Sequence, residues 1–328
     1  MAAGIVSESI LVTGASGFIG RSLCSRLLAD GFHVRAAVRD ALDGQDMPYG
    51  AEIIPVGSIG STTDWSRALS GIDAVVHLAA RAHVIEESDP DPMNAFREVN
   101  ALGTERLAEA AAQSGVQRLV FVSSIGVNGE RSGENAFTEN DTPAAHTPYA
   151  VSKREAEEAL NKIEQETGME VVILRPPMVY GPNAPGNFAR LIELVRRDCP
   201  LPIGKIKNLR SFIYIGNLVD SIIACIEHPK AAGQTFLVSD GQDISTPELI
   251  RMIAGAMGKK AKLFPCSASL LKMIGKVTGK SYEIERLTGS LRIDIAKIRK
   301  ELSWTPPFTL EQGLRMTAER FISNEKNI

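Results

Sequence analysis

Residues 13–20 read Thr-Gly-Ala-Ser-Gly-Phe-Ile-Gly, and this stretch decides the fold class. It follows a β-branched apolar run at 9–13 and opens a longer amphipathic stretch, so it lies at a predicted turn from strand to helix. Gly14 would permit a tight turn, Gly17 would let backbone N–H groups approach a pyrophosphate, and Gly20 would let the helix pack close to the sheet. The residues expected to contact a dinucleotide at this turn are Gly14, Ser16, Gly17, Phe18, Ile19 and Gly20.

Strand-like and helix-like stretches alternate through the first 175 or so residues. Several of the strand-like runs are apolar without alternation, as expected for strands that are covered on both faces. The pattern predicts an α/β fold, with a doubly wound parallel sheet between two layers of helices. The predicted strands are 9–13, 33–38, 52–56, 74–78, 118–123 and 171–174, and the predicted helices are 17–30, 63–69, 94–114 and 148–167.

Pro and Gly cluster after residue 175, at Arg175-Pro-Pro and Gly181-Pro-Asn-Ala-Pro-Gly, which predicts a domain boundary. The dinucleotide-binding domain would comprise 1–178, with 208–239 returning to it through a strand at 235–239. A smaller α/β substrate domain would comprise 179–207 and 240–328. Thr246 is expected to cap the third of the later helices, and 323–328 should form a frayed tail. These later helices are predicted at 187–197, 217–227, 247–257 and 294–302.

Composition argues against several classes of protein. Lys and Arg number 36 against 39 Asp and Glu, so the net charge of -3 provides no basic surface for nucleic acid. The N-terminus lacks the features of a signal peptide and no apolar run approaches the roughly 18 residues of a membrane span, so we expect a cytoplasmic protein without membrane insertion. The cysteines lie far apart with no CxxC pair, which predicts neither a metal site nor a disulfide framework. They are Cys24, Cys199, Cys225 and Cys266.

The end of the second predicted strand bears on the choice of dinucleotide. An acidic residue there would hold the adenosine ribose of NAD(H), but this chain has Val38 followed by Arg39. A guanidinium forms charge-assisted bonds with the 2′-phosphate of NADP(H). NADP(H) is therefore favoured and NAD(H) stays possible, because a shift of one residue would bring Asp40 to the ribose.

A candidate catalytic pair lies in Tyr149-Ala-Val-Ser-Lys153, four residues apart on one helix face. An ammonium within about 4 Å of the phenol contributes roughly 4 kcal/mol at an effective dielectric constant of about 20, enough to lower a tyrosine pKa by about three units. Tyr and Lys at this spacing are usually a solvated helix face. Here, however, the preceding strand ends in Ser123-Ser124, where a hydroxyl could orient a substrate oxygen.

Together these motifs resemble the extended short-chain dehydrogenase/reductase family over nearly the whole chain. The resemblance implies that Ser124, Tyr149 and Lys153 form the catalytic triad, with Tyr149 as acid/base, Ser124 bonding the reacting oxygen, and Lys153 binding the nicotinamide ribose while lowering the tyrosine pKa. Ser123 is the competing serine. The motifs are 13–20, His77-Leu-Ala-Ala80, Asn100 with Gly103-Thr104, Ser124, Tyr149 with Lys153, and Arg175-Pro176. The further implied cofactor contacts are Arg39, Leu78, Ala79, Ala80, Asn100, Tyr149, Lys153 and Pro176.

A second group of motifs resembles the nucleotide-sugar branch of that family. The resemblance implies that Asn187 and Arg210, with Ser124 and Tyr149, bind a UDP-sugar, the first two at its diphosphate. Arg286 and Arg292 are further candidates for that role, and Asn217 stands where many relatives carry Asp. The motifs are Val179-Tyr-Gly-Pro182, Gly186-Asn-Phe188, Arg210-Ser-Phe-Ile213 and Leu302-Ser-Trp-Thr-Pro306.

Three reactions compete on this scaffold. Dehydration needs an Asp-Glu pair after the catalytic hydroxyl, and this chain has Ile125-Gly-Val-Asn128 instead. We expect reduction of a 4-keto sugar, because 186–250 resembles bacterial 4-reductases of UDP-2-acetamido-2,6-dideoxy-4-hexulose. These form UDP-N-acetylquinovosamine or its C4 epimer for surface polysaccharide. The alternative is an NAD-dependent UDP-sugar 4-epimerase, like UDP-glucose 4-epimerase; a non-catalytic NADP-binding regulator and a ligand-free scaffold account for fewer of the motifs.

A homodimer is expected from two alanine-rich helix faces, around 100–112 and 149–160. In the resembling family the equivalent helices pair across a two-fold axis as a four-helix bundle. The same faces could instead be part of the chain's own core.

Overall fold

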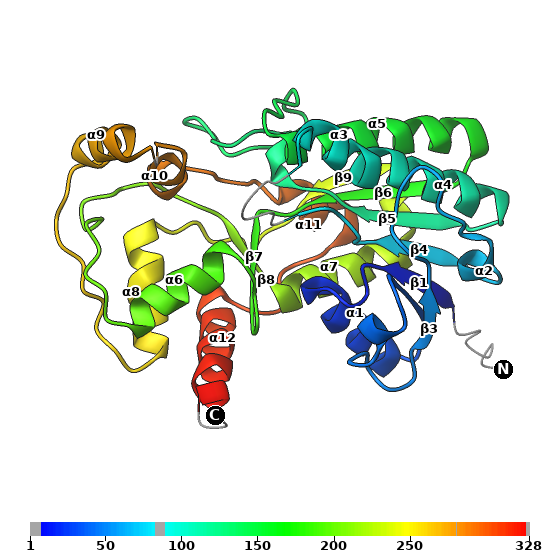
Figure 1. Cartoon of the computed structure of the whole chain (residues 1–328), viewed down its shortest axis with the longest axis horizontal. Coiled ribbons are helices and arrows are strands. Elements are labelled where there is room, and N and C mark those ends of the chain that lie inside the picture. Colours follow the sequence, from blue (N-terminus) through cyan, green and yellow to red (C-terminus); the bar gives the residue numbers. More distant parts are fainter. Residues whose placement is uncertain (1–7, 83–88, 280, 326–328) are drawn as a thin grey trace.

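The computed structural model describes residues 8–82, 89–279 and 281–325 (Figure 1). Its main sheet has seven parallel strands in the order β3-β2-β1-β4-β5-β6-β9. The order reverses between β1 and β4, and the crevice at the carboxyl ends of such strands is where open α/β sheets bind ligands. The predicted doubly wound parallel fold is confirmed. The strands are β1 Ser9–Thr13, β2 His33–Val38, β3 Glu52–Pro55, β4 Ala74–His77, β5 Arg118–Val122, β6 Glu170–Arg175 and β9 Gln234–Leu237.

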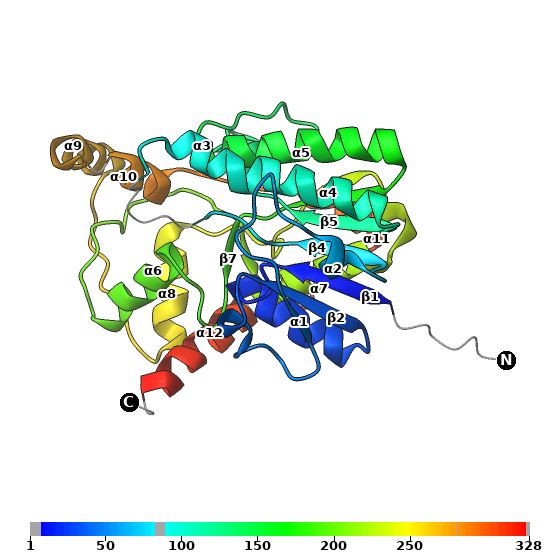
Figure 2. The ribbon, with the colours of Figure 1, turned by 45° about the vertical axis from the view of Figure 1, so that its right-hand side comes forward.

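Helices cover both faces of this sheet (Figure 2). Side chains alternate along a strand, so Ile10 and Val12 of β1 join one buried cluster while Leu11 joins the other. The first cluster contains Leu23 and Leu27 of the glycine-turn helix, and the second contains the inward faces of α4 and α5. The covering helices are α1 Phe18–Ala29, α2 Ser66–Leu69, α3 Pro92–Arg97, α4 Gly103–Gln113, α5 Pro148–Thr167 and α7 Ile215–Glu227.

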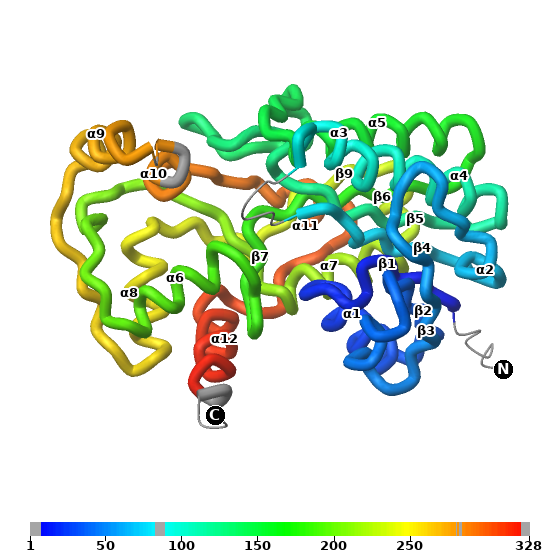
Figure 3. The backbone as a smooth tube through the Cα atoms, viewed as in Figure 1, coloured from blue at the N-terminus to red at the C-terminus, as the bar shows by residue number. Residues whose placement is uncertain are grey.

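The chain leaves the sheet after β6 and returns to it once, as the tube in Figure 3 shows. The strand predicted at 235–239 is β9, which pairs in parallel with β6. Two short strands outside the main sheet, β7 Met178–Tyr180 and β8 Phe212–Tyr214, pair with each other. The division into two domains stays a prediction. The remaining helices are α6 Asn187–Arg196, α8 Thr246–Ala256, α9 Ala268–Thr278, α10 Ser281–Thr288, α11 Ala296–Leu302 and α12 Leu310–Glu325.

Three predictions of local structure are wrong. The single helix expected at 94–114 is divided by a π-helical turn, Glu98–Leu102, that turns the Asn100 amide toward other backbone and side-chain groups. Ser245 rather than Thr246 caps α8, because its hydroxyl accepts a bond from the Glu248 N–H. The tail predicted from 323 is helical as far as Glu325, and the rest of it lies outside the described residues.

The hydrogen bonds of Asn217 explain why this position has an asparagine where the family resemblance leads one to expect an aspartate. Its amide nitrogen donates to Asp240 Oδ1 at 2.7 Å and to the Phe308 carbonyl at 2.8 Å, and its amide oxygen accepts from the Phe308 N–H at 2.9 Å. Asp240 also accepts from the buried Tyr180 hydroxyl at 2.8 Å. An aspartate at position 217 would bring a second carboxylate against Asp240, so Asn217 and Asp240 are a matched pair.

Among the described residues, no helix is both long enough and apolar enough to cross a bilayer.

Candidate active site

The glycine turn is pressed against the segment that follows β4. Gly14 has φ +65°, and a Cβ placed on it would lie 2.8 Å from the Ala79 backbone nitrogen. A Cβ on Gly20 would lie 2.2 Å from the Gly14 carbonyl oxygen, so α1 approaches the turn more closely than any side chain allows. Helix α1 begins after Gly17 without a side-chain cap. This backbone-lined opening at a helix N-terminus fits the pyrophosphate of a dinucleotide.

The other predicted contacts lie at or near this opening. Ser16, Phe18 and Ile19 are half-buried along the turn and the first turn of α1. Leu78, Ala79 and Ala80 directly follow β4 and are also half-buried. Pro176 is buried beyond the end of β6, where its carbonyl accepts from the Ile125 N–H.

A chain of buried polar groups runs from the turn toward α5, and the sequence reasoning missed it. The Thr13 hydroxyl lies 2.6 Å from Nδ1 of His77, and Nε2 of His77 lies 2.9 Å from the Thr104 hydroxyl. Thr104 in turn donates to the Asn100 carbonyl at 2.7 Å. Burial lowers the pKa of His77 to about 3, so this imidazole is neutral. The sequence signal available was a lone histidine ending an otherwise apolar strand.

Asn100 connects this series of hydrogen bonds to α5, the helix that carries Tyr149 and Lys153. Its side-chain oxygen accepts from the Arg81 N–H at 2.7 Å, and its nitrogen donates to the Arg81 carbonyl at 3.1 Å and to the Ser152 hydroxyl at 3.0 Å. Ser152 donates to the Tyr149 carbonyl at 2.8 Å. The polar chain therefore fixes the first turn of α5, which carries Tyr149, relative to the glycine turn.

The structure brings the ends of β5 and α5 together. A Cβ on Gly126, two residues after Ser124, would lie 3.4 Å from the Ser124 Oγ and 3.3 Å from the Ala150 Cβ. The Lys153 side chain of α5 packs on β5, with its ammonium 4.0 Å from the centre of the Phe121 ring. Tyr149 lies one turn before Lys153 and packs edge-on against Phe96.

The charge states of the pair differ from the expectation. Burial raises the pKa of Tyr149 to about 12, and the Lys153 ammonium is not among the groups that shift it. Burial lowers the pKa of Lys153 to about 7, a shift that the Glu157 carboxylate partly opposes. The predicted lowering of the tyrosine pKa by lysine is therefore not seen in this structure, where burial alone shifts that pKa.

The two serines have different environments. Ser124 caps the short turn that follows β5, with its Oγ accepting from the Gly126 N–H at 3.1 Å. The Ser123 hydroxyl is buried and, within the described residues, has no hydrogen-bond partner. The choice of Ser124 over Ser123 as the substrate-binding serine stays a prediction.

A buried ion pair, Arg175 with Glu157, lies one helical turn beyond Lys153. Arg175 at the end of β6 donates to Glu157 through Nε at 3.0 Å and Nη2 at 2.5 Å, and through Nη1 to Asn128 at 2.9 Å. Glu157 follows Lys153 by one helical turn on the same helix face. Sequence reasoning used Arg175 only as part of a motif; the i,i+4 spacing of Lys153 and Glu157 was the signal for its partner.

At the end of β2, Val38 occupies the place predicted for it, paired with Pro55 of β3. Arg39 follows and is exposed. The Asp40 carboxylate accepts from the backbone N–H groups of Leu42 and Asp43 at 2.9 and 3.1 Å. Both bonds go to Oδ1, so the turn engages one of the two carboxylate oxygens of Asp40.

Of the predicted diphosphate residues, Arg210 and Arg286 are brought together. The Arg210 Nη1 donates to the carbonyls of Arg286 and Gly289 at 2.8 and 3.1 Å. Burial lowers the pKa of Arg210 to about 10, and the positive charge of Arg286 contributes. Asn187 is the exposed first residue of α6, and the Arg292 guanidinium donates to the Glu134 carbonyl.

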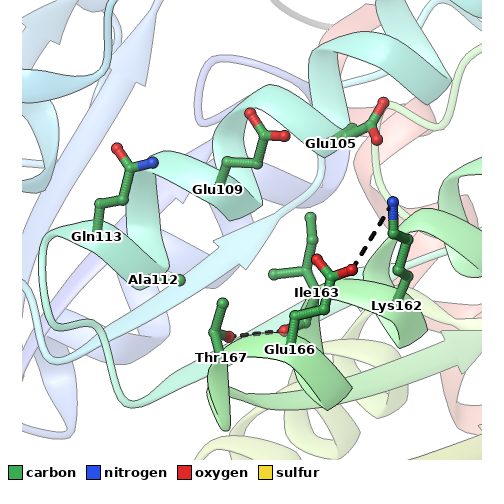
Figure 4. Close-up of a pocket in the computed structure, with 8 residues that line it drawn as sticks. All are labelled: Glu105, Glu109, Ala112, Gln113, Lys162, Ile163, Glu166 and Thr167. Atoms are coloured by element: carbon green, nitrogen blue, oxygen red, sulfur yellow. Dashed lines mark hydrogen bonds and ion pairs between the residues drawn. The ribbon is translucent and has the colours of Figure 1, made fainter.

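A hollow on the outer face of α4 and α5 lies apart from these groups (Figure 4). Its charged residues are three glutamates and Lys162, which pairs with Glu166 at 3.8 Å, so a diphosphate would be repelled there. Most alanines of the two helices are buried instead, although Ala112 lines the hollow. Ala108, Ala111 and Ala156 are fully buried in the chain's own core. The alanine-rich faces therefore give no support for a dimer, which stays a prediction.

Within the described parts of the chain, no group of three His, Cys, Asp or Glu could hold a metal.

Comparisons with known proteins agree with this architecture. A model of the NAD dependent epimerase/dehydratase family matches residues 10–239. The chain belongs to this family. The match runs from β1 to just beyond β9, so it includes the glycine turn, Ser124 and the Tyr149–Lys153 pair. The resemblance to extended short-chain dehydrogenases/reductases is thereby confirmed.

Individual relatives of this family act on sugars. The chain is 44% identical over 318 residues to a UDP-glucose 4-epimerase of Vibrio cholerae, a match covering 96% of each chain. It is 26% identical to an N-acetyl-alpha-D-glucosaminyl-diphospho-ditrans,octacis-undecaprenol 4-epimerase of Escherichia coli O157:H7, over 98% of each. A crystal structure of UDP-glucuronic acid 4-epimerase from Bacillus cereus, in complex with UDP-glucuronic acid and NAD, superposes with a TM-score of 0.79 at 27% identity, covering 96% of this chain and 99% of that one.

These findings define the class of enzyme. The protein is an enzyme of the NAD dependent epimerase/dehydratase family, and its named relatives include nucleotide-sugar 4-epimerases.

Proposed function

We propose that the protein oxidises and reduces C4 of a UDP-linked hexose, and that its net reaction is 4-epimerisation. The observation that carries the proposal is that the turn capped by Ser124, at the end of β5, lies against Ala150 of α5, the helix that carries Tyr149 and Lys153. The 44% identity to a UDP-glucose 4-epimerase supports the choice of net reaction. This ranking differs from the reductase favoured by the sequence alone, because the named relatives act as epimerases.

The residues divide the work as follows. The glycine turn would hold the pyrophosphate of the dinucleotide, which when bound would supply hydride transfer from C4 and back to its opposite face. Ser124 would hydrogen-bond the C4 oxygen, and Tyr149 as phenolate would take the proton from that oxygen and, as phenol, return it. Burial alone gives the Tyr149 phenol a pKa of about 12 in this structure, and the proposal assigns to Lys153, one helical turn away, the cation that would stabilise the phenolate when dinucleotide and substrate are bound.

The same proposal names the residues that would bind the diphosphate of the substrate. Two neighbouring guanidinium groups repel each other, and a diphosphate beside them would relieve that repulsion. Arg210 and Arg286 are such neighbours. We therefore extend the predicted diphosphate site from Asn187 and Arg210 to include Arg286.

Reduction of a 4-keto, 6-deoxy UDP-N-acetylhexosamine is the second candidate, and the end of β2 favours it. An epimerase retains its dinucleotide, whereas a reductase must exchange it. Exposed Arg39 fits the 2′-phosphate of an exchangeable NADPH. Arg39→Ala should weaken NADPH binding by about 1.5 to 3 kcal/mol and leave NADH binding unchanged.

Stoichiometry decides between the two candidates. The purified protein is incubated with UDP-glucose or UDP-N-acetylglucosamine and NAD, and separately with the 4-keto sugar and NADPH. An epimerase interconverts the C4 epimers without net change in the dinucleotide, which NMR of the sugar and absorbance of the dinucleotide would show. Oxidation of one NADPH for each 4-keto sugar, without epimerisation, would instead establish the reductase. Failure of both reactions would contradict the proposal.

A further inference from the structure

Helix α9 presents an apolar surface to solvent. Of its residues only Leu271 and Gly275 are buried, on the side turned toward the rest of the chain. Four aliphatic side chains at i, i+3, i+4 and i+7 form one stripe on another side of the helix. Their exposed fractions are 44%, 58%, 44% and 83% for Leu270, Met273, Ile274 and Val277, and we call these four residues the α9 stripe.

The segment around this stripe is strongly basic. Residues 249–282 contain one Arg and six Lys but neither Asp nor Glu, in a chain whose net charge is -3. Lys272 and Lys276 lie on α9 itself and are exposed beside the stripe. Helix α9 therefore combines the exposed apolar stripe with two exposed lysines, within a segment of the chain that has no acidic residue.

The chemistry of this surface fits a lipid bilayer better than a protein partner. Protein interfaces are enriched in aromatic residues and Arg and depleted of Lys. Helix α9 has neither an aromatic residue nor an arginine in its sequence, and its cations are lysines. An aliphatic stripe flanked by lysines is the pattern of helices that lie in the interface of anionic membranes, where the apolar face enters the acyl boundary and the ammonium groups meet lipid phosphates.

We propose that α9 docks the protein reversibly onto an anionic phospholipid surface. The helix lies at the outer end of the molecule in both views of the ribbon, far from β2 and β3, so it can reach a flat surface (Figures 1 and 2). It packs on α10, whose Arg286 carbonyl accepts from Arg210. Docking through α9 would therefore hold the proposed diphosphate site near the bilayer. The inference does not depend on which sugar reaction the protein catalyses.

The test is co-sedimentation of the purified full chain with vesicles. Vesicles of phosphatidylcholine alone are compared with vesicles that also contain phosphatidylglycerol, at low and high salt. Two variants probe the surface: Met273→Ser with Val277→Ser removes the centre of the stripe, and Lys272→Glu with Lys276→Glu reverses the charge. The matched control combines Leu194→Ser on α6, whose leucine is 39% exposed, with Lys300→Glu on α11.

We expect binding to the anionic vesicles only, weakened by salt, because each lysine near the surface contributes about fivefold. Both α9 variants should weaken it at least about tenfold, while the control variant binds as the wild type does. Thermal unfolding and turnover of a soluble UDP-sugar should be unchanged in all variants, because these side chains are exposed. Absence of binding to anionic vesicles, or binding that the α9 variants leave unchanged, would refute the proposal. A smaller particle mass for the α9 variants than for the wild type without lipid would show that a second copy of the chain covers the stripe instead, and would also refute it.

Discussion

Burial of the Lys153 ammonium has a measurable consequence for stability. Its pKa is about 7 in the folded chain, against an ordinary value near 10.5. Between these two values the unfolded chain binds more protons than the folded chain, so the free energy of unfolding rises with pH in this window. The contribution of Lys153 to the free energy of unfolding is therefore complete only above the pKa that lysine has in the unfolded chain. That contribution is lost as the pH falls through about 7, the pKa of Lys153 in the folded chain. From about pH 7 to about pH 8.5, integration gives a rise of roughly 1 to 2 kcal/mol.

Replacing the ionisable group isolates this contribution. Lys153→Met keeps a long apolar stem above the Phe121 ring but cannot titrate. The free energy of unfolding in urea is measured for the wild type and the variant at both pH values, and the difference between the two proteins is taken at each pH. Titrating groups that both proteins share cancel in this difference, including Cys24 and Cys225, whose pKa values burial raises. Relative to the wild type, the variant should be less stable at the higher pH than at the lower by roughly 1 to 2 kcal/mol.

The control is Lys162→Met on the same helix, whose side chain is 69% exposed. Its stability relative to the wild type should not change between the two pH values. If the Lys153 variant behaved in the same way, the ammonium would have an ordinary pKa in the folded chain. The argument that desolvation governs the charge state of this site would then be wrong.

Tyr149→Phe should lower turnover by roughly 10² to 10⁴ with an unchanged urea midpoint, and near-parental turnover would show that another group is the acid/base. Gly20→Ala should lower the free energy of unfolding by about 1 to 3 kcal/mol, because its Cβ would meet the Gly14 carbonyl. The control is Gly255→Ala on α8, where a Cβ would have nothing within 4 Å and the change should be neutral or stabilising. Equal effects of the two substitutions would contradict close packing at Gly20. Asn217→Asp should destabilise the fold by about 1 to 3 kcal/mol at neutral pH and recover on acidification, and a loss that does not change with pH would rule out repulsion from Asp240 as its cause. Light scattering should give the mass of a homodimer, and a monomer at micromolar concentration would end that prediction.

Several features of the protein were predictable from local sequence. The glycine spacing of 13–20 identified the dinucleotide turn, and the apolar runs located every strand of the main sheet to within a residue or two. Tyr149 and Lys153 could be paired because residues four apart on a helix share a face. These signals all arise from the period of a single helix or strand and need no knowledge of distant residues.

The tertiary structure decided what distant residues do to one another. Arg210 and Arg286 lie 76 residues apart in sequence and become neighbours only in the folded chain. His77 and Thr104 likewise meet across 27 residues. The alanines of α4 and α5 could have been core or interface, and only the packed structure shows that most of them are buried. The charge states of Tyr149 and Lys153 depend on desolvation, which is set by everything packed around a group. Sequence spacing specifies which groups lie on one face of an element, whereas burial and long-range contact depend on how all the elements pack.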